Sequence, residues 1–568
     1  MASIPHLRKN DVSHQLIVNG KPLLMLAGEL QNSSLTSAEY MKEVWPKMVA
    51  THVNTVLGCV TWEDIEPEEG RFDFANLDQV VLDARAHGIH LVLLWFGSFK
   101  NGLSTYVPGW VKTNPKRFPR AKLRKAGGEL ATADVLSIFH DEAPKADAKA
   151  FATLLEHVKQ IDEAHSTVVM VQVENETGLL GDSRDGSKHA NDRFAQPVPQ
   201  DLIDFIDGHW DTLTDAFRAN FKPFKTAATK RGTWEDVFGR SKKTDELFMA
   251  YHYALYLNRV ASAGKAKYPL PLYTNVWQNY AAADADNDFP TVVGGGHEPG
   301  DYPSGGAVVD VLDVWQRFAP ALDLIAPDVY LNDYASSCAK YRHRNQPLFI
   351  PEQRRDEYGA RRVWQAFGSH QCLGTSPFGV DTQDPATNPF TRHYRLLDSV
   401  SQIVLAAQRR PHASYGFFFD DLPAGANANT ASSPSQDHHH TVVFDDWQLT
   451  IHRCFVFGQP GPGAGMVVRL GPARFLLVGW GFHVAVRSLR PRAAFTGFLR
   501  FEEKCVANKA TGELRTLRKL NGDETRSGSY AMMPNEEPDY GGFPICVTVP
   551  ARTMVAELEV YAFGEEDE

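Results

Sequence analysis

The sequence has no excess of positive charge and no long apolar run, and each absence excludes a class of partner. The formal net charge of the 568-residue chain is −11, whereas nucleic-acid and acidic-membrane partners favour a basic surface. No apolar run reaches the roughly 18 residues that a membrane-spanning helix needs. We therefore expect neither a nucleic-acid partner nor a membrane partner.

The chain is also poor in cysteine, and its N-terminus lacks an apolar segment. The six cysteines have no metal-ligand spacing, which predicts reduced thiols. The opening MASIPHLRKND does not have the apolar core of a signal peptide, which predicts a cytoplasmic protein, or a secreted one if the natural N-terminus has been trimmed. The histidine run at 438–440 lies in a polar segment and is expected to be a surface loop. No metal and no cofactor are predicted.

Apolar strand-like segments alternate with helix-like segments from residue 22 to about 410. The predicted strands are continuous apolar runs, as in parallel strands that are buried on both faces. They span 22–28, 54–60, 90–97, 167–174, 270–277, 322–330, 347–353 and 373–380. Eight strand–helix units predict an α/β fold, a (β/α)8 TIM barrel with loop insertions, over residues 1–410.

The first predicted helix carries two local signals. Thr36-x-x-Glu39 is a capping-box pattern, which predicts the start of the helix at Thr36. Pro46 lies inside the same apolar periodicity and predicts a kink or a restart.

The pattern changes after residue 410. Short runs rich in Val and Phe, such as 440–446, 466–470 and 554–563, are separated by Gly and Pro. They predict a C-terminal all-β sandwich domain over residues 411–568. Its role stays open between packing against the barrel, assisting dimerisation as a homodimer, and holding a polysaccharide.

Polar residues follow the predicted barrel strands, where the active face of such a barrel lies. Carboxylates and amides can bond sugar hydroxyls, and an indole can pack on the C–H face of a sugar ring, so this set favours a carbohydrate site. Glycoside cleavage needs two carboxyl groups that flank the bond, and Glu176 and Glu352 end strands on opposite sides of the barrel mouth. The candidate substrate-binding residues are Glu29, Asn32, Trp95, Lys100, Asn101, Asn175, Trp277 and Tyr330.

The motif QVENETG, residues 172–178, resembles the Q-x-E-N-E-[YT]-G signature of family 35 glycoside hydrolases, the β-galactosidases of a large (β/α)8 clan. In that clan the acid/base Glu follows Asn at the end of strand 4, and the nucleophile Glu ends strand 7. Glu176 and Glu352, the latter within PLFIPEQ, match these positions. The segment 54–78 also resembles the family's NTV…W…EP…G.FDF….D pattern.

The resemblance covers about residues 15–410 and implies a retaining, exo-acting β-galactosidase that removes terminal β-galactosyl residues from oligosaccharides or plant-type polysaccharides. It implies that Glu352 is the nucleophile, that Glu176 is the acid/base, that Asn175 bonds the sugar 2-hydroxyl and that Tyr330 orients Glu352. The segments GELQNSS and LLWFGSFKNG differ from the GSIHY and GPYICAEW types of the best-known members. They resemble a shorter branch with a single β domain after the barrel, in which substrate preference is less uniform.

Alternatives stay open at this point. Within the enzyme class, the chain can be a related β-glucosidase or a transglycosylase that acts on β-glycosides. Outside it, the chain can be a carbohydrate-binding scaffold protein. Structural roles also compete for single residues, such as rim packing for Trp95 and Trp277, or an ion pair with a neighbouring arginine for Glu352.

Overall fold

The computed structural model describes residues 3–227, 229–280, 296–421, 439–456, 459–460, 462–534 and 552–564. The chain divides into two compact units. The first comprises Met1–Arg8, Leu16–Gln353 and Gly374–Asp384, and the second comprises Lys9–Gln15, Arg354–Leu373 and Pro385–Glu568. The second unit thus also includes segments that precede residue 410.

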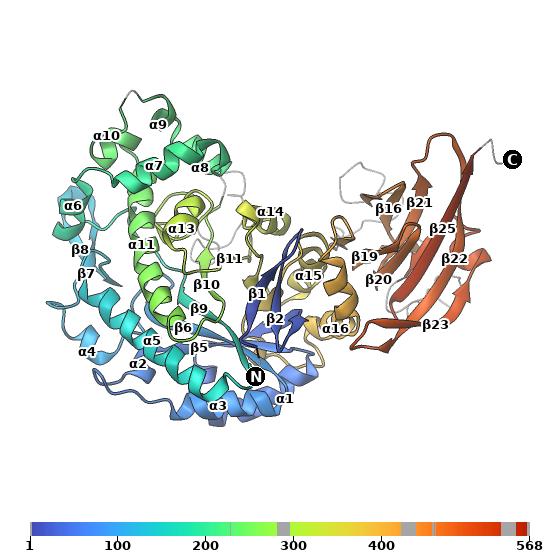
Figure 1. The fold of residues 1–568 in the computed structure, drawn as a ribbon, viewed down its shortest axis with the longest axis horizontal. Helices are drawn as coiled ribbons and strands as arrows, with labels where there is room; N and C mark the ends of the chain where they lie inside the picture. Colours follow the sequence, from blue (N-terminus) through green and yellow to red (C-terminus); the bar gives the residue numbers. More distant parts are fainter. Residues whose placement is uncertain are drawn as a thin grey trace. The chain divides into compact units, whose positions relative to one another are not determined.

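The first unit is built around eight parallel strands, and all eight predicted strands are present (Figure 1). They are β4 (Met25–Glu29), β5 (Thr55–Thr61), β6 (His90–Lys100), β9 (Val168–Asn175), β10 (Leu272–Trp277), β11 (Leu324–Asp328), β12 (Ile350–Gln353) and β13 (Gly374–Pro377). Their order in the sheet is β11-β10-β9-β6-β5-β4-β13-β12. Val329 pairs in parallel with Gln353, so the two ends of the sheet meet. The predicted TIM barrel is confirmed.

Helices surround these strands, and smaller elements fill the insertions. The helices between the strands are α1 (Ala38–Ala50), α3 (Ala75–Ala86), α5 (Glu142–Asp162), α7 (Gln200–His209), α11 (Lys242–Lys265), α13 (Leu312–Phe318) and α14 (Tyr334–Lys340). The inserted elements are α2 (Trp62–Ile65), α4 (Gly109–Lys112), β7 (Arg120–Arg124), β8 (Leu130–Leu136), α6 (Lys188–Phe194), α8 (Asp215–Asn220), α9 (Lys222–Thr226) and α10 (Trp234–Phe238).

Helix α1 corrects two local predictions. Its cap is Ser37 rather than Thr36, because the Ser37 side chain accepts a hydrogen bond from the Tyr40 backbone N–H. The helix also continues through Pro46 without a restart. A proline removes one backbone hydrogen bond, and the buried face of α1, which includes Trp45 and Met48, compensates for that loss.

The segment 54–78, which carries part of the family resemblance, is held by Glu66. Its carboxylate accepts hydrogen bonds from the Trp62 indole at 2.8 Å and from the Gly70 backbone N–H at 2.7 Å. Glu66 is buried. The motif residues of this segment therefore hold the turn that follows β5.

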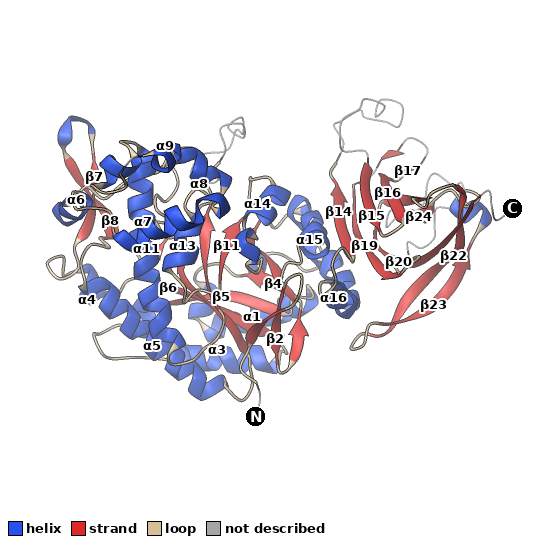
Figure 2. Cartoon of the chain, turned by 45° about the horizontal axis from the view of Figure 1, so that its top comes forward, coloured by secondary structure: helices blue, strands red, loops and turns tan. Residues whose placement is uncertain are grey.

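The second unit contains α15 (Glu357–Ser369), α16 (Pro389–Ala407) and two antiparallel sheets (Figure 2). The larger sheet comprises β14 (Ser414–Phe419), β19 (Gly463–Gly471), β20 (Arg474–Trp480), β25 (Val555–Gly564), β22 (Ala493–Asn508) and β23 (Glu513–Leu520). The smaller sheet comprises β15 (His439–Phe444), β16 (Trp447–Arg453), β21 (Phe482–Ser488) and β24 (Ala531–Met533). Side chains of both sheets, among them Phe417, Trp447 and Phe475, form one apolar core. The predicted β-sandwich is confirmed.

Short strands complete the described chain. β1 (His6–Lys9), β2 (His14–Val18) and β3 (Lys21–Leu23) form a separate small sheet, and β17 (Phe455–Val456) pairs with β18 (Gln459–Pro460). His439 and His440 lie on β15 and not in a surface loop, which corrects that prediction, while His438 lies outside the described residues. Among the described residues, no helix is both long and apolar enough to cross a bilayer.

Candidate active site

A cavity of about 370 Å³ opens where several barrel strands end. It brings together seven of the ten residues that the sequence predicts for catalysis or substrate binding, namely Asn32, Lys100, Asn101, Glu176, Trp277, Tyr330 and Glu352. Gln31, Gln278, Tyr280, Asp328, Asn332 and Phe378 complete the lining. The cavity therefore combines carboxylates, amides and aromatic rings, which is the chemistry expected of a carbohydrate site.

Glu352 accepts hydrogen bonds from three donors, which lie at or just after the ends of β9, β10 and β11. Its Oε2 accepts from the Tyr330 hydroxyl at 2.8 Å. Its Oε1 accepts from Nδ2 of Asn275 at 3.2 Å and from Nδ2 of Asn175 at 3.4 Å. The Tyr330 contact is the one that its predicted orienting role requires. These bonds stabilise an ionised carboxylate and fix its direction.

The chain turns sharply at the end of β9, and this turn separates two glutamates. Glu174 and Glu176 have φ of 62° and 44°, a region that residues other than glycine seldom occupy. Glu174 points away from the cavity and accepts the backbone N–H groups of Ser98, at 3.2 Å, and Phe99, at 2.6 Å. Glu176 lines the cavity, and its own N–H donates to Oδ1 of Asn275 at 2.9 Å.

The electrostatic environment keeps Glu176 protonated up to neutral pH. Burial, followed by the negative charge of Glu352, raises the pKa of Glu176 to about 7, against the opposing charge of Lys100. Burial alone would lower the pKa of Lys100, but the surrounding carboxylates, with Glu352 and Glu176 first, raise it. Lys100 therefore stays positively charged beside the two glutamates.

Asn175 is fully buried and does not line the cavity. Its Oδ1 accepts from Nζ of Lys100 at 3.0 Å, while its Nδ2 points to Glu352. In this arrangement its amide links the lysine to the glutamate. Its predicted contact with a sugar 2-hydroxyl stays a prediction.

Two further predicted substrate-binding residues, Trp95 and Glu29, do not line the cavity. The Trp95 indole is completely buried, donates to Oδ1 of Asp147 on α5 at 2.9 Å and packs against Phe151 of the same helix. Successive side chains of a strand alternate between its two faces, and Trp95 occupies the face toward α5. Glu29 is also buried, and burial followed by the charge of Glu352 raises its pKa well above the usual value.

Asn275 and Asp328 also follow predicted strands toward the barrel mouth, but they are not among the predicted catalytic and substrate-binding residues. Both lie at strand ends, as the predicted residues do, so position alone does not separate them from ordinary strand-end polar groups. Asn275 contacts Glu176, Glu352 and Asp328 through a single side-chain amide. Asp328 lines the cavity, and one of its carboxylate oxygens lies within 4.8 Å of an oxygen of each of the two glutamates.

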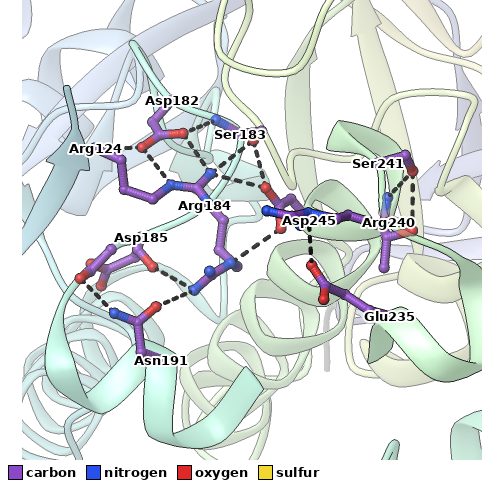
Figure 3. A network of polar contacts seen from close by, with 12 residues as sticks. Arg124, Asp182, Ser183, Arg184, Asp185, Asn191, Glu235, Arg240, Ser241 and Asp245 are labelled. Atoms are coloured by element: carbon purple, nitrogen blue, oxygen red, sulfur yellow. Dashed lines mark hydrogen bonds and ion pairs between the residues drawn. The ribbon is translucent and has the colours of Figure 1, made fainter. Parts of the chain in front are cut away.

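A polar network holds the loop that follows Glu176 (Figure 3). Arg124 of β7 binds both carboxylate oxygens of Asp182, at 3.0 Å and 2.7 Å, and one oxygen of Asp245 on α11, at 2.9 Å. Arg184 binds the other oxygen of Asp245 at 3.1 Å. The network thus ties the loop after β9 to the β7–β8 insertion and to α11.

One oxygen each of Glu176, Asp328 and Glu352 lies within 4.8 Å of the others, and among the described residues this is the group that can hold a cation. The prediction that the protein needs no metal stays a prediction.

Comparisons with known proteins agree with this chemistry. A family model described as Beta-galactosidase, that of glycoside hydrolase family 42, matches residues 33–222, and a domain of unknown function (DUF5597) matches residues 390–532. The match over residues 33–222 includes Glu176 and indicates a glycoside hydrolase. This match supports the β-galactosidase type, although not family 35 in particular.

A β-galactosidase from Xanthomonas manihotis is 34% identical over 82 residues, which are 14% of this chain and 14% of that protein. The match therefore spans only about a seventh of that relative's length. Solved β-galactosidases from Rahnella sp. R3 and from Bacillus circulans sp. alkalophilus both show 15% identity and a TM-score of 0.43. The first similarity covers 66% of this chain and 56% of the other, and the second covers 67% and 57%.

Proposed function

We propose that the protein is a retaining, exo-acting β-galactosidase that removes terminal β-D-galactosyl residues from oligosaccharides or plant-type polysaccharides. The observation that carries the proposal is the pair of carboxyls, Glu176 after β9 and Glu352 in β12, whose oxygens lie within 4.8 Å in one cavity. Retaining glycosidases place their carboxyls roughly 5 Å apart, and inverting ones leave room for a water between them.

The reaction proceeds in two displacements. A carboxylate oxygen of Glu352 attacks the anomeric carbon, the bond to the leaving oxygen breaks, and Glu176 donates its proton to that oxygen. Glu352 is then an ester and has lost its charge, which lowers the pKa of Glu176. Glu176 now removes a proton from a water molecule as the water oxygen attacks the anomeric carbon. The bond to Glu352 breaks, which restores its carboxylate and releases galactose with retention.

The finer parts of the proposal have narrower support. Family 35 rests on QVENETG and PLFIPEQ, whereas the β-galactosidase type also rests on the family match over residues 33–222. A galactoside rather than a glucoside substrate rests on that match. A homodimer and a cytoplasmic location stay predictions.

Proton NMR of the purified protein acting on an aryl β-D-galactopyranoside tests the function directly. We expect β-galactose to appear first and to mutarotate later. Release of α-galactose first would exclude the covalent mechanism. Turnover of the matching aryl β-glucoside alone would retain both glutamates and overturn the choice of sugar.

Azide separates the roles of the two glutamates. Glu352→Gly should lower kcat by at least about 10³-fold, and azide should restore turnover with α-galactosyl azide as product, because it attacks in place of the missing carboxylate. Glu176→Gly should form the glycosyl-enzyme from an activated aryl galactoside, and azide should then yield β-galactosyl azide. The exposed Glu39→Gln is the control variant. If Glu352→Gly gave β-galactosyl azide and Glu176→Gly gave α-galactosyl azide, the roles of nucleophile and acid/base would be reversed.

A further inference from the structure

The cavity holds a third carboxyl, Asp328, which the two-carboxylate mechanism does not use. Asp328 ends β11, is 3% exposed and lines the cavity. A buried third acid beside Glu176 and Glu352 is unfavourable if all three are ionised, because like charges repel at this separation. Its presence calls for a specific role.

The side chain of Asn275 contacts Asp328 and both glutamates. Its Nδ2 donates to Oδ2 of Asp328 at 2.9 Å and to Oε1 of Glu352 at 3.2 Å. Its Oδ1 accepts the backbone N–H of Glu176 at 2.9 Å. One amide thus sets the distances among three acids. Gln278 adds a bond to the Asp328 backbone carbonyl at 2.7 Å.

The second oxygen of Asp328 is placed to carry a proton. Oδ1 is buried and accepts no hydrogen bond from the residues that the structure describes. An oxygen of the Asp328 carboxyl and one of the Glu176 carboxyl lie within 4.8 Å of each other. Two buried carboxyls can form a hydrogen bond with each other only if one of them is protonated. Burial, followed by the charges of Glu352, Glu176 and Glu29, raises the pKa of Asp328 well above its usual value.

We propose that Asp328 is a positioning residue that stays a neutral acid and donates a hydrogen bond to Glu176. The catalytic role of Asp328 rests on the proposed function, whereas its hydrogen bond to Glu176 does not. The bond stabilises the ionised form of Glu176, which arises after Glu176 gives its proton to the leaving oxygen. No proton passes through Asp328 in either displacement. Its effect is to lower the pKa of Glu176 toward neutrality, where the residue has to act as both acid and base.

The variants Asp328→Ala and Asp328→Asn test this role. Alanine removes the donor, whereas asparagine can still donate through its amide and accept from Asn275. The pKa of Glu176 is measured by carbon NMR of the full chain labelled at the glutamate carboxyl carbon, with the Glu176 signal assigned from its absence in Glu176→Gln. The alkaline limb of kcat/KM on an aryl β-galactoside is measured in parallel.

We expect Asp328→Ala to raise the pKa of Glu176 by about one unit, the size of one hydrogen bond to a charged group. The alkaline limb should move upward with it, and Asp328→Asn should stay close to wild type in both. An unchanged pKa in Asp328→Ala would overturn the proposal, and so would an equal rise in both variants. Because the NMR titration needs no turnover, it stands even if the chain does not cleave galactosides. Failure of the proposed function would show only in the kinetic assay.

Discussion

At the scale of single residues, side-chain direction decides what a strand-end residue can do. Glu174 and Glu176 are separated by one residue and both are buried, yet the left-handed backbone at each sends them to different surroundings. Backbone strain of this kind costs about 1–3 kcal/mol and is often found at functional sites. As a result of this backbone conformation, Glu176 reaches the cavity and Glu174 does not.

The two tryptophans of the predicted site give a matched test of this distinction. Trp277→Phe should raise KM for an aryl β-galactoside about five- to tenfold, because Trp277 lines the cavity. Trp95→Phe should leave KM unchanged and lower the free energy of unfolding by about 1–3 kcal/mol, because it removes the indole bond to Asp147. KM and denaturant unfolding of both variants check this. A raised KM in Trp95→Phe would restore its predicted substrate contact.

At the scale of elements, the loop after β9 begins at Glu176, the proposed acid/base residue, and depends on contacts outside the barrel strands. Figure 3 shows how Arg124 and Arg184 converge with Asp182 and Asp245. The bidentate Arg124–Asp182 pair is partly buried, and such pairs fix geometry more than isolated surface ion pairs do. The network is therefore expected to hold the position of Glu176.

Replacing Arg124 tests the contribution of the network to catalysis. Arg124→Met should lower kcat about tenfold while the barrel stays folded, because small misplacements of a catalytic group reduce rate strongly. Arg71→Met is the matched control, since Arg71 makes one exposed ion pair with Glu68 and lies outside the network. Steady-state kinetics and thermal unfolding are measured for both. Equal kcat values in the two variants would exclude a positioning role for Arg124.

At the scale of the whole molecule, buried carboxyls make stability depend on pH. Glu246 of α11 is fully buried, and burial raises its pKa to about 7 even though Lys243 lies 3.3 Å away. The folded protein thus binds this proton more tightly than the unfolded chain does. Its contribution to stability is complete below the usual pKa and is lost as pH rises through about 7.

The substitution Glu246→Gln removes this pH-dependent contribution to stability. A rise from 4.5 to about 7 corresponds to about 3 kcal/mol of unfolding free energy. Between pH 4.5 and 7.5, the unfolding free energy of the wild type should fall by up to that amount more than that of Glu246→Gln. Urea unfolding at several pH values measures it, with the exposed Glu39→Gln as control. Parallel curves for wild type and Glu246→Gln would show that the pKa of Glu246 is the same in the folded and the unfolded chain.

Much of the fold could be predicted from the sequence because its signals are local or periodic. The eight apolar runs are each buried in a parallel strand, and their alternation with helices specifies a barrel. Strand-end position likewise predicted that Glu176 and Glu352 face one barrel mouth, and both line the cavity there. The exact helix cap could not be predicted, since Ser37 and Thr36 are chemically alike and adjacent.

Tertiary structure alone decided which polar residues share the cavity. Trp95 and Trp277 both lie near strand ends, but the face of the strand on which each side chain lies separates a packing residue from a cavity residue. The proposed hydrogen bond between Asp328 and Glu176 joins positions 152 residues apart in the chain. The sequence by itself determined the elements and the two glutamates, because these depend on local pattern and motif. Distances between separate strands decide which carboxyls lie together, which charges are buried and which way each side chain points. Only the folded barrel sets those distances.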